Sequence, residues 1–299
     1  MGMTSNQLAL VEAIAENRIQ DAKNCAIACC AEEQTKKNER AVRRCRALLE
    51  NRGPEFIELP PSLNGILRME DVSDFQEGRY YLGNRETEIF LHIEQTNRVS
   101  LQLLELGIPY LNSTLLYGEP GTGKTMFGRF VAYKLGLPFA YVNFSFLIDS
   151  YMGSTSKNLK RVFDFCKGQP CVLMLDEIDC IALKRDGQGG SDGELARTTI
   201  SLMQEMDQLT NEQIVIGATN RADRVDPAVK RRFFQKYEIR KFGYRERFAM
   251  ATKFLDDVGV SYNSDKVRDF CKEEKTQAEI IQFATQIVIE KVVNGWEKK

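Results

Sequence analysis

The sequence predicts an α/β protein in which helices cover a largely parallel sheet. From Leu82 onward, short apolar segments alternate with helical patterns, which is the element order of parallel α/β folds. A glycine-rich loop joins one of these segments to a helix, and a run of carboxylates ends another. With 299 residues, of which 43% are apolar and 28% charged, the chain is long enough to bury a sizeable core.

Composition narrows the range of functions. Lys and Arg total 41 against 42 for Asp and Glu, and this formal net charge of −1 argues against a protein whose main task is to coat nucleic acid. The single histidine, His92, excludes a His-rich metal site and a pair of catalytic imidazoles. We therefore expect chemistry that depends on carboxylates, Lys, Arg and backbone dipoles.

The N-terminal part, residues 1–52, is expected to be helical, because residues 7–50 contain no Pro or Gly and show a helical apolar period. It could bind a substrate or adaptor, or pack as a structural appendage. Four cysteines lie there: Cys25, Cys29, Cys30 and Cys45. Their spacing fits no common zinc motif, so reduced, packed thiols are favoured over a zinc site. No secretory signal or membrane-length apolar run is present, which predicts a cytoplasmic protein without a membrane span.

The remaining chain divides into three predicted parts. Gly53-Pro54 and Pro60-Pro61 mark a linker over residues 53–80, a large α/β domain covers 81–242, and a helical domain covers 243–299. The candidate strands are residues 113–116, 140–143, 172–175 and 214–218. The helices expected in the last domain are residues 244–258, 264–272 and 276–294.

A phosphate-binding loop follows the first strand. Residues 118–125 spell GEPGTGKT, a G-x-x-x-x-G-K-[ST] pattern between a strand and a helix, as this motif requires. Its glycines allow successive backbone N–H groups to surround a phosphate, Lys124 can reach the phosphate oxygens, and the Thr125 hydroxyl can coordinate Mg²⁺. The residues predicted to bind ATP are Gly118, Glu119, Pro120, Gly121, Thr122, Gly123, Lys124, Thr125, Met126 and Asp176.

Polar side chains also follow the later strands. The apolar run 171–175 ends in Asp176 and Glu177, at the edge where parallel sheets bind ligands. Asp176 is expected to hold Mg²⁺ through water, and Glu177 to polarise the attacking water. Asn220 follows the strand 214–218 and either orients that water or serves as a turn residue.

A basic segment comes next. Residues 228–247 contain eight Lys or Arg against two Glu, a local charge of +6. The segment is either a nucleic-acid patch or the source of two arginines, Arg231 and Arg232, that are presented to an ATP on a neighbouring subunit.

The motifs GEPGTGKT, LDEID, GATN and DPAVKRRF, in this order, resemble those of the AAA clade of the AAA+ ATPases over residues 95–290. The resemblance implies a P-loop NTPase αβα sandwich with a C-terminal helical lid, assembled as a hexameric ring with ATP and Mg²⁺ at its subunit interfaces. Arg231 and Arg232 then match the arginine fingers that act on the next subunit's ATP. The catalytic set implied is Lys124, Glu177, Asn220, Arg231 and Arg232.

Tyr151, Met152 and Gly153 are similar to the first pore loop of this family, where an aromatic residue contacts a polypeptide in the central channel. The alternative is a tyrosine packed on its own domain. The glycine-rich residues 187–193 would form the second pore loop. Two positions depart from the usual pattern of this family. Glu119 replaces a common Pro at a free position of the phosphate loop, and Gln277 replaces a Gly that lies close to the nucleotide in the family.

We therefore expect an ATP-hydrolysing ring that remodels, unfolds or disassembles a protein partner by threading it through a central pore. Ring ATPases that act on HORMA-domain partners in defence systems are one subtype. The alternative is a nucleic-acid-associated ATPase, such as a loader or a transposition-type regulator, which the +6 segment suggests. A non-hydrolysing scaffold is disfavoured, because the hydrolytic residues are all present.

Overall fold

The computed structural model describes residues 4–15, 19–32, 42, 59–108, 110–142, 144–149, 155–167, 169–182, 192–209 and 213–296. It divides into two compact units, residues 1–58 and residues 59–299. Each unit is described by itself below.

The first unit contains a helical hairpin. Helices α1 (Ser5–Ala15) and α2 (Ile19–Glu32) are antiparallel, since Asn6 Nδ2, near the start of α1, donates to Glu32 Oε1 at the end of α2 over 2.6 Å. Cys25, Cys29 and Cys30 are half-buried free thiols on α2. Most of residues 33–58 lies outside the described part of the chain, so the predicted helix beyond α2 is untested.

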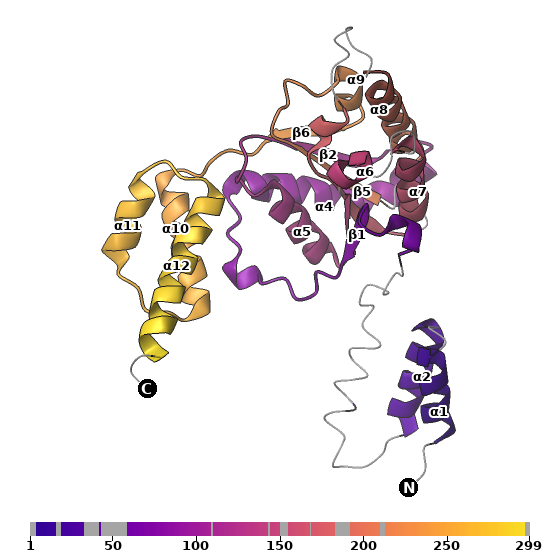
Figure 1. Ribbon diagram of the computed structural model, residues 1–299, viewed down its shortest axis with the longest axis horizontal. Helices are drawn as coiled ribbons and strands as arrows, with labels where there is room; N and C mark the ends of the chain where they lie inside the picture. Colours follow the sequence, from indigo (N-terminus) through magenta and orange to yellow (C-terminus); the bar gives the residue numbers. More distant parts are fainter. Residues whose placement is uncertain are drawn as a thin grey trace. The chain divides into compact units, whose positions relative to one another are not determined.

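The second unit is built on a six-stranded sheet with the order β1-β3-β4-β5-β2-β6. Figure 1 labels β1, β2, β5 and β6 of this sheet. The strands are β1 (Leu67–Glu70), β2 (Asn112–Tyr117), β3 (Phe139–Val142), β4 (Cys171–Leu175), β5 (Gln213–Thr219) and β6 (Gln235–Glu238). Five strands are parallel, and only β1 runs antiparallel to its neighbour β3. This is the mixed, mostly parallel α/β fold that the sequence predicts.

Two layers of helices cover the sheet because successive strand residues point to opposite faces. Along β4, Cys171, Leu173 and Leu175 pack with one cluster, while Val172 and Met174 pack with the other. The first cluster lies under α6 (Phe144–Asp149), α7 (Thr155–Lys167) and α8 (Asp192–Met206). The second lies under α4 (Asn84–Glu105) and α5 (Lys124–Leu135). The result is a three-layer αβα sandwich.

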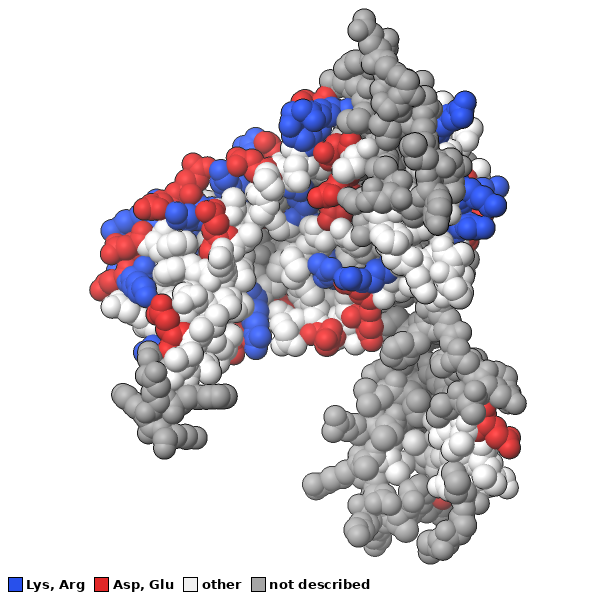
Figure 2. Space-filling model, viewed as in Figure 1, with Lys and Arg blue, Asp and Glu red and all other residues white. Residues whose placement is uncertain are grey.

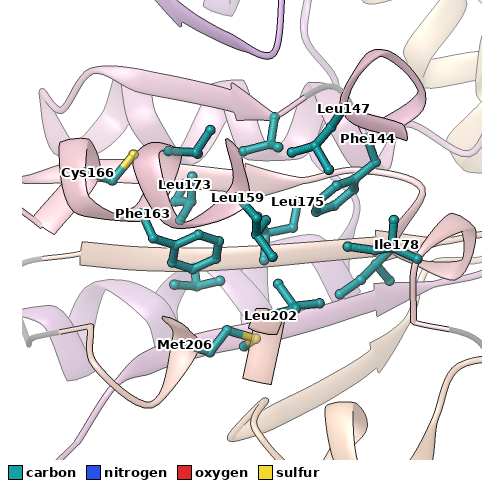
Figure 3. Close-up of a cluster of buried hydrophobic side chains, with 14 of the residues drawn as sticks. Phe144, Leu147, Leu159, Phe163, Cys166, Leu173, Leu175, Ile178, Leu202 and Met206 are labelled. Atoms are coloured by element: carbon teal, nitrogen blue, oxygen red, sulfur yellow. The ribbon is translucent and has the colours of Figure 1, made fainter. Parts of the chain in front are cut away.

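Helix α7 shows how the sequence dictates this packing. Its buried residues Leu159, Val162, Phe163 and Cys166 are spaced by three and four, so they form one apolar stripe. Figure 3 shows Leu159, Phe163 and Cys166 lying over Leu173 of the sheet, with Leu202 and Met206 of α8 beside them. This core fixes the strands whose carboxyl ends carry the polar residues.

The last three helices form a bundle with a core of their own. They are α10 (Tyr244–Val258), α11 (Ser264–Lys272) and α12 (Gln277–Trp296), and their buried contacts include Leu255, Val267 and Ile280. Their bounds agree with the predicted helices to within two residues. We call residues 243–296 the lid.

Strands β1 and β6 are differences from the sequence-based expectation. The segment 53–80 is predicted to be a linker, yet residues 61–79 contain β1 between two short 3₁₀ helices, Pro61–Leu63 and Glu77–Arg79. Both strands have only four residues and lie at the sheet edges, so most of their side chains are partly or fully exposed. Such strands carry too short an apolar pattern to be recognised in sequence.

Candidate active site

The phosphate loop connects β2 to α5. Gly123 has a left-handed backbone with φ of 88°, and α5 begins at the next residue, so its free N–H groups face the loop. A side chain at Gly118 would collide with the carbonyl oxygen of Ile239 in the segment after β6. This geometry is compatible with the anion site at a helix N-terminus that the sequence predicts.

The Lys124 ammonium lies inside this loop. Its Nζ donates to the carbonyl oxygens of Gly118 over 3.0 Å and of Glu119 over 2.8 Å. Burial lowers the pKa of Lys124, while the nearby Asp176 and Asp179 carboxylates oppose that shift. The side chain is thus a buried point charge held where phosphate oxygens would bind.

Thr125 and Asp176 meet across the loop. The Thr125 hydroxyl donates to Asp176 Oδ2 over 2.6 Å, and both residues line a hollow of about 720 Å³. A hydroxyl and a carboxylate are the hard oxygen ligands that Mg²⁺ prefers, so the two residues fit the predicted metal site. When bound there, Mg²⁺ would neutralise charge on the phosphate oxygens.

Glu177 has an unusual backbone. Its φ of 52° makes it the only non-glycine residue with a positive φ in the described part of the chain. Its N–H donates to Asp176 Oδ1 over 3.0 Å, and its side chain is exposed. Backbone strain of this kind is common at functional sites. The turn separates the two carboxylates. Asp176 is hydrogen-bonded to Thr125, whereas Glu177 is accessible to water.

The central strand β5 brings Asn220 to the same edge. Pairing of Leu175 with Gly217 and of Tyr117 with Thr219 places Asn220 between the acidic pair after β4 and the loop after β2. Asn220 is exposed there. The sheet therefore brings the loop, the acidic pair and Asn220 together along three adjacent strand ends.

Thr219 and Asp179 form a support that sequence reasoning missed. Thr219 Oγ1 donates to Asp179 Oδ1 over 2.6 Å and accepts from the Arg221 N–H over 2.9 Å. The hydrogen bond joins the segment after β4 to the end of β5, on which Asn220 stands. The available signal was the third carboxylate of the DEID sequence together with a hydroxyl at a buried strand end.

The predicted arginines lie near the amino-terminal ends of the strands, whereas the phosphate loop lies at their carboxyl ends. Ser113 Oγ, near the start of β2, donates to the Arg232 carbonyl and accepts from the Phe234 N–H, both over 3.0 Å. Ser113 and Tyr117 are four strand residues apart, which is roughly 13 Å along β2. The arginine pair is thus anchored a full strand length from the phosphate loop of its own chain.

The two adjacent arginines have different surroundings in the structure. Arg232 donates through Nε and Nη2 to the Asp207 carboxylate over 3.2 and 3.0 Å, and through Nη1 to the Ala228 carbonyl over 3.1 Å. Arg231 is exposed, and within the described residues its guanidinium has no hydrogen bond or ion pair. Of the two, Arg231 is the one available to another molecule.

Gln277 does not enter the phosphate loop. Its buried side chain donates from Nε2 to the Arg240 carbonyl over 2.8 Å, while Oε1 has no partner among the described residues. The next residue, Ala278, donates its N–H to the Gly121 carbonyl over 3.0 Å. The lid thus contacts the phosphate loop through backbone at this point.

The predicted pore loop, Tyr151, Met152 and Gly153, lies outside the described residues, and so do residues 187–191 of the glycine-rich segment. Helix α7 begins at Thr155, directly after the first of these segments. The role of Tyr151 therefore stays a prediction from the sequence.

A phosphate loop and an acidic pair at the carboxyl edge of a parallel sheet define a nucleoside triphosphatase. Comparison with known proteins narrows this class. The family model described as ATPase family associated with various cellular activities (AAA) matches residues 114–241. The uncharacterized AAA family ATPase y4kL of Sinorhizobium fredii is 32% identical over a 271-residue alignment that covers 86% of this chain and 80% of the relative.

Two further relatives are matched over part of their length. The peroxisomal ATPase PEX6 of Rattus norvegicus is 34% identical over 63% of this chain and 20% of its own length. The 26S proteasome subunit RPT4 of Saccharomyces cerevisiae is 38% identical over 45% of this chain and 32% of its own length. The chain belongs to the AAA family of ATPases, which confirms the family and the ATP hydrolysis that the sequence predicts.

Proposed function

We propose that the chain forms a ring, hexameric by resemblance to its family, in which ATP is hydrolysed between copies to remodel a protein partner. The observation that carries the proposal is the position of Arg231. It is exposed near the amino-terminal ends of the strands, away from the phosphate loop of its own chain. An arginine anchored there is better placed for the site of a second copy than for its own. Each copy then gives one arginine and receives one, and head-to-tail contacts of this kind form a ring when the rotation between copies closes.

The surface around Arg231 supports contact with a second copy. Arg231 and Arg232 line a hollow of about 530 Å³ together with Leu104 and Ile108. These apolar side chains and the neighbouring Phe234 are 57%, 49% and 61% exposed. An arginine surrounded by exposed apolar and aromatic side chains is typical of a protein interface.

The proposed hydrolysis assigns one task to each residue. Backbone N–H groups of the loop and Lys124 bind the phosphates, and Thr125 and Asp176 hold Mg²⁺. Glu177 accepts the proton of the attacking water, which Asn220 orients. Arg231 of the neighbouring copy neutralises charge that develops on the transferred phosphoryl group, an effect worth about 10³- to 10⁵-fold in rate.

A protein partner is favoured by the relatives and by the resemblance of Tyr151 to a pore loop. The matched relatives include a peroxisomal ATPase and a subunit of the 26S proteasome.

No helix among the described residues has the length and apolar character needed to span a membrane. We propose a cytoplasmic protein whose residues 1–52 select the substrate or adaptor.

The nucleic-acid alternative has less support than the local charge of +6 suggests, because three of the eight basic side chains in segment 228–247 pair with carboxylates. Arg232 contacts Asp207, Arg240 contacts Glu238, and Lys241 contacts two glutamates. On the face shown in Figure 2, blue and red side chains alternate over the described residues rather than gathering by sign.

The test is capture with a hydrolysis-deficient variant. Glu177→Gln is expected to bind ATP without hydrolysing it, and therefore to retain its protein partner in pull-downs that contain ATP but not ADP. Tyr151→Ala should hydrolyse ATP at the wild-type rate yet fail to remodel the captured partner. Normal remodelling by Tyr151→Ala would contradict threading, and ATP-dependent capture of DNA in place of protein would contradict protein remodelling.

A further inference from the structure

Glu119 places a negative charge in a loop that must bind a polyphosphate. Its carbonyl oxygen accepts from Lys124 Nζ over 2.8 Å, so the residue lies next to the ammonium that contacts the phosphates. Its side chain is largely exposed. A carboxylate so close to a nucleoside triphosphate would repel it, unless a cation neutralises that carboxylate.

Lys241 supplies such a cation. Its Nζ lies 2.7 Å from Glu119 Oε2 and 3.1 Å from Glu274 Oε1. Hydrogen bonds to Glu119 and Glu274 raise the pKa of Lys241, so the ammonium stays charged at neutral pH. The Lys241 side chain thereby joins the phosphate loop to two later parts of the chain, its own segment after β6 and the segment that contains Glu274.

Those two parts belong to the lid and its connector. Lys241 stands between β6 and α10, and Glu274 stands between α11 and α12. Close by, the Ala278 N–H donates to the Gly121 carbonyl over 3.0 Å. Residues 274–278 therefore lie over the loop, with Lys241 as the charged contact and Ala278 as the backbone contact.

We propose that Lys241 is a positioning residue for nucleotide binding: it neutralises Glu119 and holds lid residues 274–278 against the phosphate loop, so that a loop containing a carboxylate can accept ATP. The proposal rests on the nucleotide site assigned above. It implies that Glu119 and Lys241 act as a pair, in which Lys241 matters most while Glu119 is charged.

The test is a double-mutant cycle on nucleotide affinity, measured by displacement of a fluorescent ATP analogue in the presence of Mg²⁺. Lys241→Met is expected to weaken ATP binding about three- to tenfold at low salt. The loss should be smaller for ADP, which carries less charge, and smaller at high salt. Lys241→Arg should retain most of the affinity. Adding Glu119→Gln to Lys241→Met should recover most of the lost affinity, although Glu274 is then left without its cation.

A matched control is the pair of Lys134 and Glu77, which are 3.0 Å apart on the surface and away from the loop. Lys134→Met should leave ATP affinity unchanged. Wild-type affinity in Lys241→Met, or an equal loss with and without Glu119→Gln, would overturn the pairing. Failure of the wild-type protein to bind Mg-ATP would instead overturn the nucleotide site on which the pairing depends.

Discussion

Asp176 and Glu177 are neighbours in sequence, yet the left-handed backbone at Glu177 gives their carboxylates different surroundings. Asp176 accepts hydrogen bonds from the Thr125 hydroxyl and the Glu177 N–H, whereas the Glu177 side chain is exposed. Sequence reasoning could assign both to the site from the motif. It could also propose a separate task for each, but not the difference in their surroundings, because that difference depends on one φ angle.

The two adjacent arginines allow a sharper test at the residue scale. If Arg231 acts on another copy's ATP as proposed, Arg231→Ala should lower ATP hydrolysis by about 10³- to 10⁵-fold while nucleotide affinity stays close to wild type. Arg232→Ala should mainly remove the exposed pair with Asp207, at a cost below about 1 kcal/mol in stability. Phosphate release and nucleotide titration measure both effects.

Mixing variants distinguishes action between copies from action within one chain. Arg231→Ala and Glu177→Gln should each be almost inactive alone. In a mixture, an Arg231→Ala copy keeps its own Glu177 and can receive Arg231 from a Glu177→Gln neighbour, so hydrolysis should partly return. If no mixing ratio restored phosphate release, Arg231 would not act across an interface.

At the element scale, an ion pair joins the edge strand β1 to the phosphate-loop helix α5. Arg129 donates through Nε and Nη2 to the Glu70 carboxylate over 2.7 and 3.1 Å, in a half-buried bidentate pair. Arg129 lies one helical turn after Thr125, and its guanidinium also lies over the Phe139 ring. The pair therefore anchors β1 close to the predicted Mg²⁺ site.

We expect Glu70→Gln to lower the free energy of unfolding by about 1–2 kcal/mol at neutral pH. Burial raises the pKa of Glu70, but Arg129 and Arg68 outweigh it and bring the pKa below its ordinary value. The stabilisation is thus complete above the ordinary carboxyl pKa and is lost as pH falls through the lower, folded-state pKa. Urea unfolding should show that the variant and wild type converge in acid; a constant difference would contradict the pairing.

The sequence predicts the interior of the fold better than its margins. Strands β2, β3, β4 and β5 are recognisable because they are short, largely buried runs between helical patterns. The edge strands β1 and β6 are not, since each has four residues with mixed exposure.

Long-range pairs in the site escape sequence reasoning for a different reason. Arg231 and Arg232 look equivalent in sequence, and what separates them is Asp207, 25 positions before Arg232. Likewise, Glu119 looks harmless at a free position of the motif until the fold brings Lys241 to it. The type of residue indicates the chemistry, but only the fold selects its partner.

At the scale of the whole molecule, the proposed sharing of each site between two copies would make activity depend on assembly. ATP hydrolysis per chain should fall on dilution, and Glu177→Gln with ATP should shift the protein toward the assembled form. Phosphate release over a wide concentration range, together with sedimentation, checks this. Constant activity per chain down to concentrations at which only monomers sediment would contradict a shared site.

The strand order has a consequence for how the protein is made. Strand β2, which carries the phosphate loop, lies between β5 and β6, and residues 118–212 separate it from the first of these neighbours. At 5–20 residues per second, that stretch takes roughly 5–20 s to synthesise. Throughout this time the apolar Leu115 and Leu116 have neither strand beside them. Strand β2, which carries the phosphate loop, thus waits longest for its partner strands. During that time the nascent chain can aggregate or recruit a chaperone.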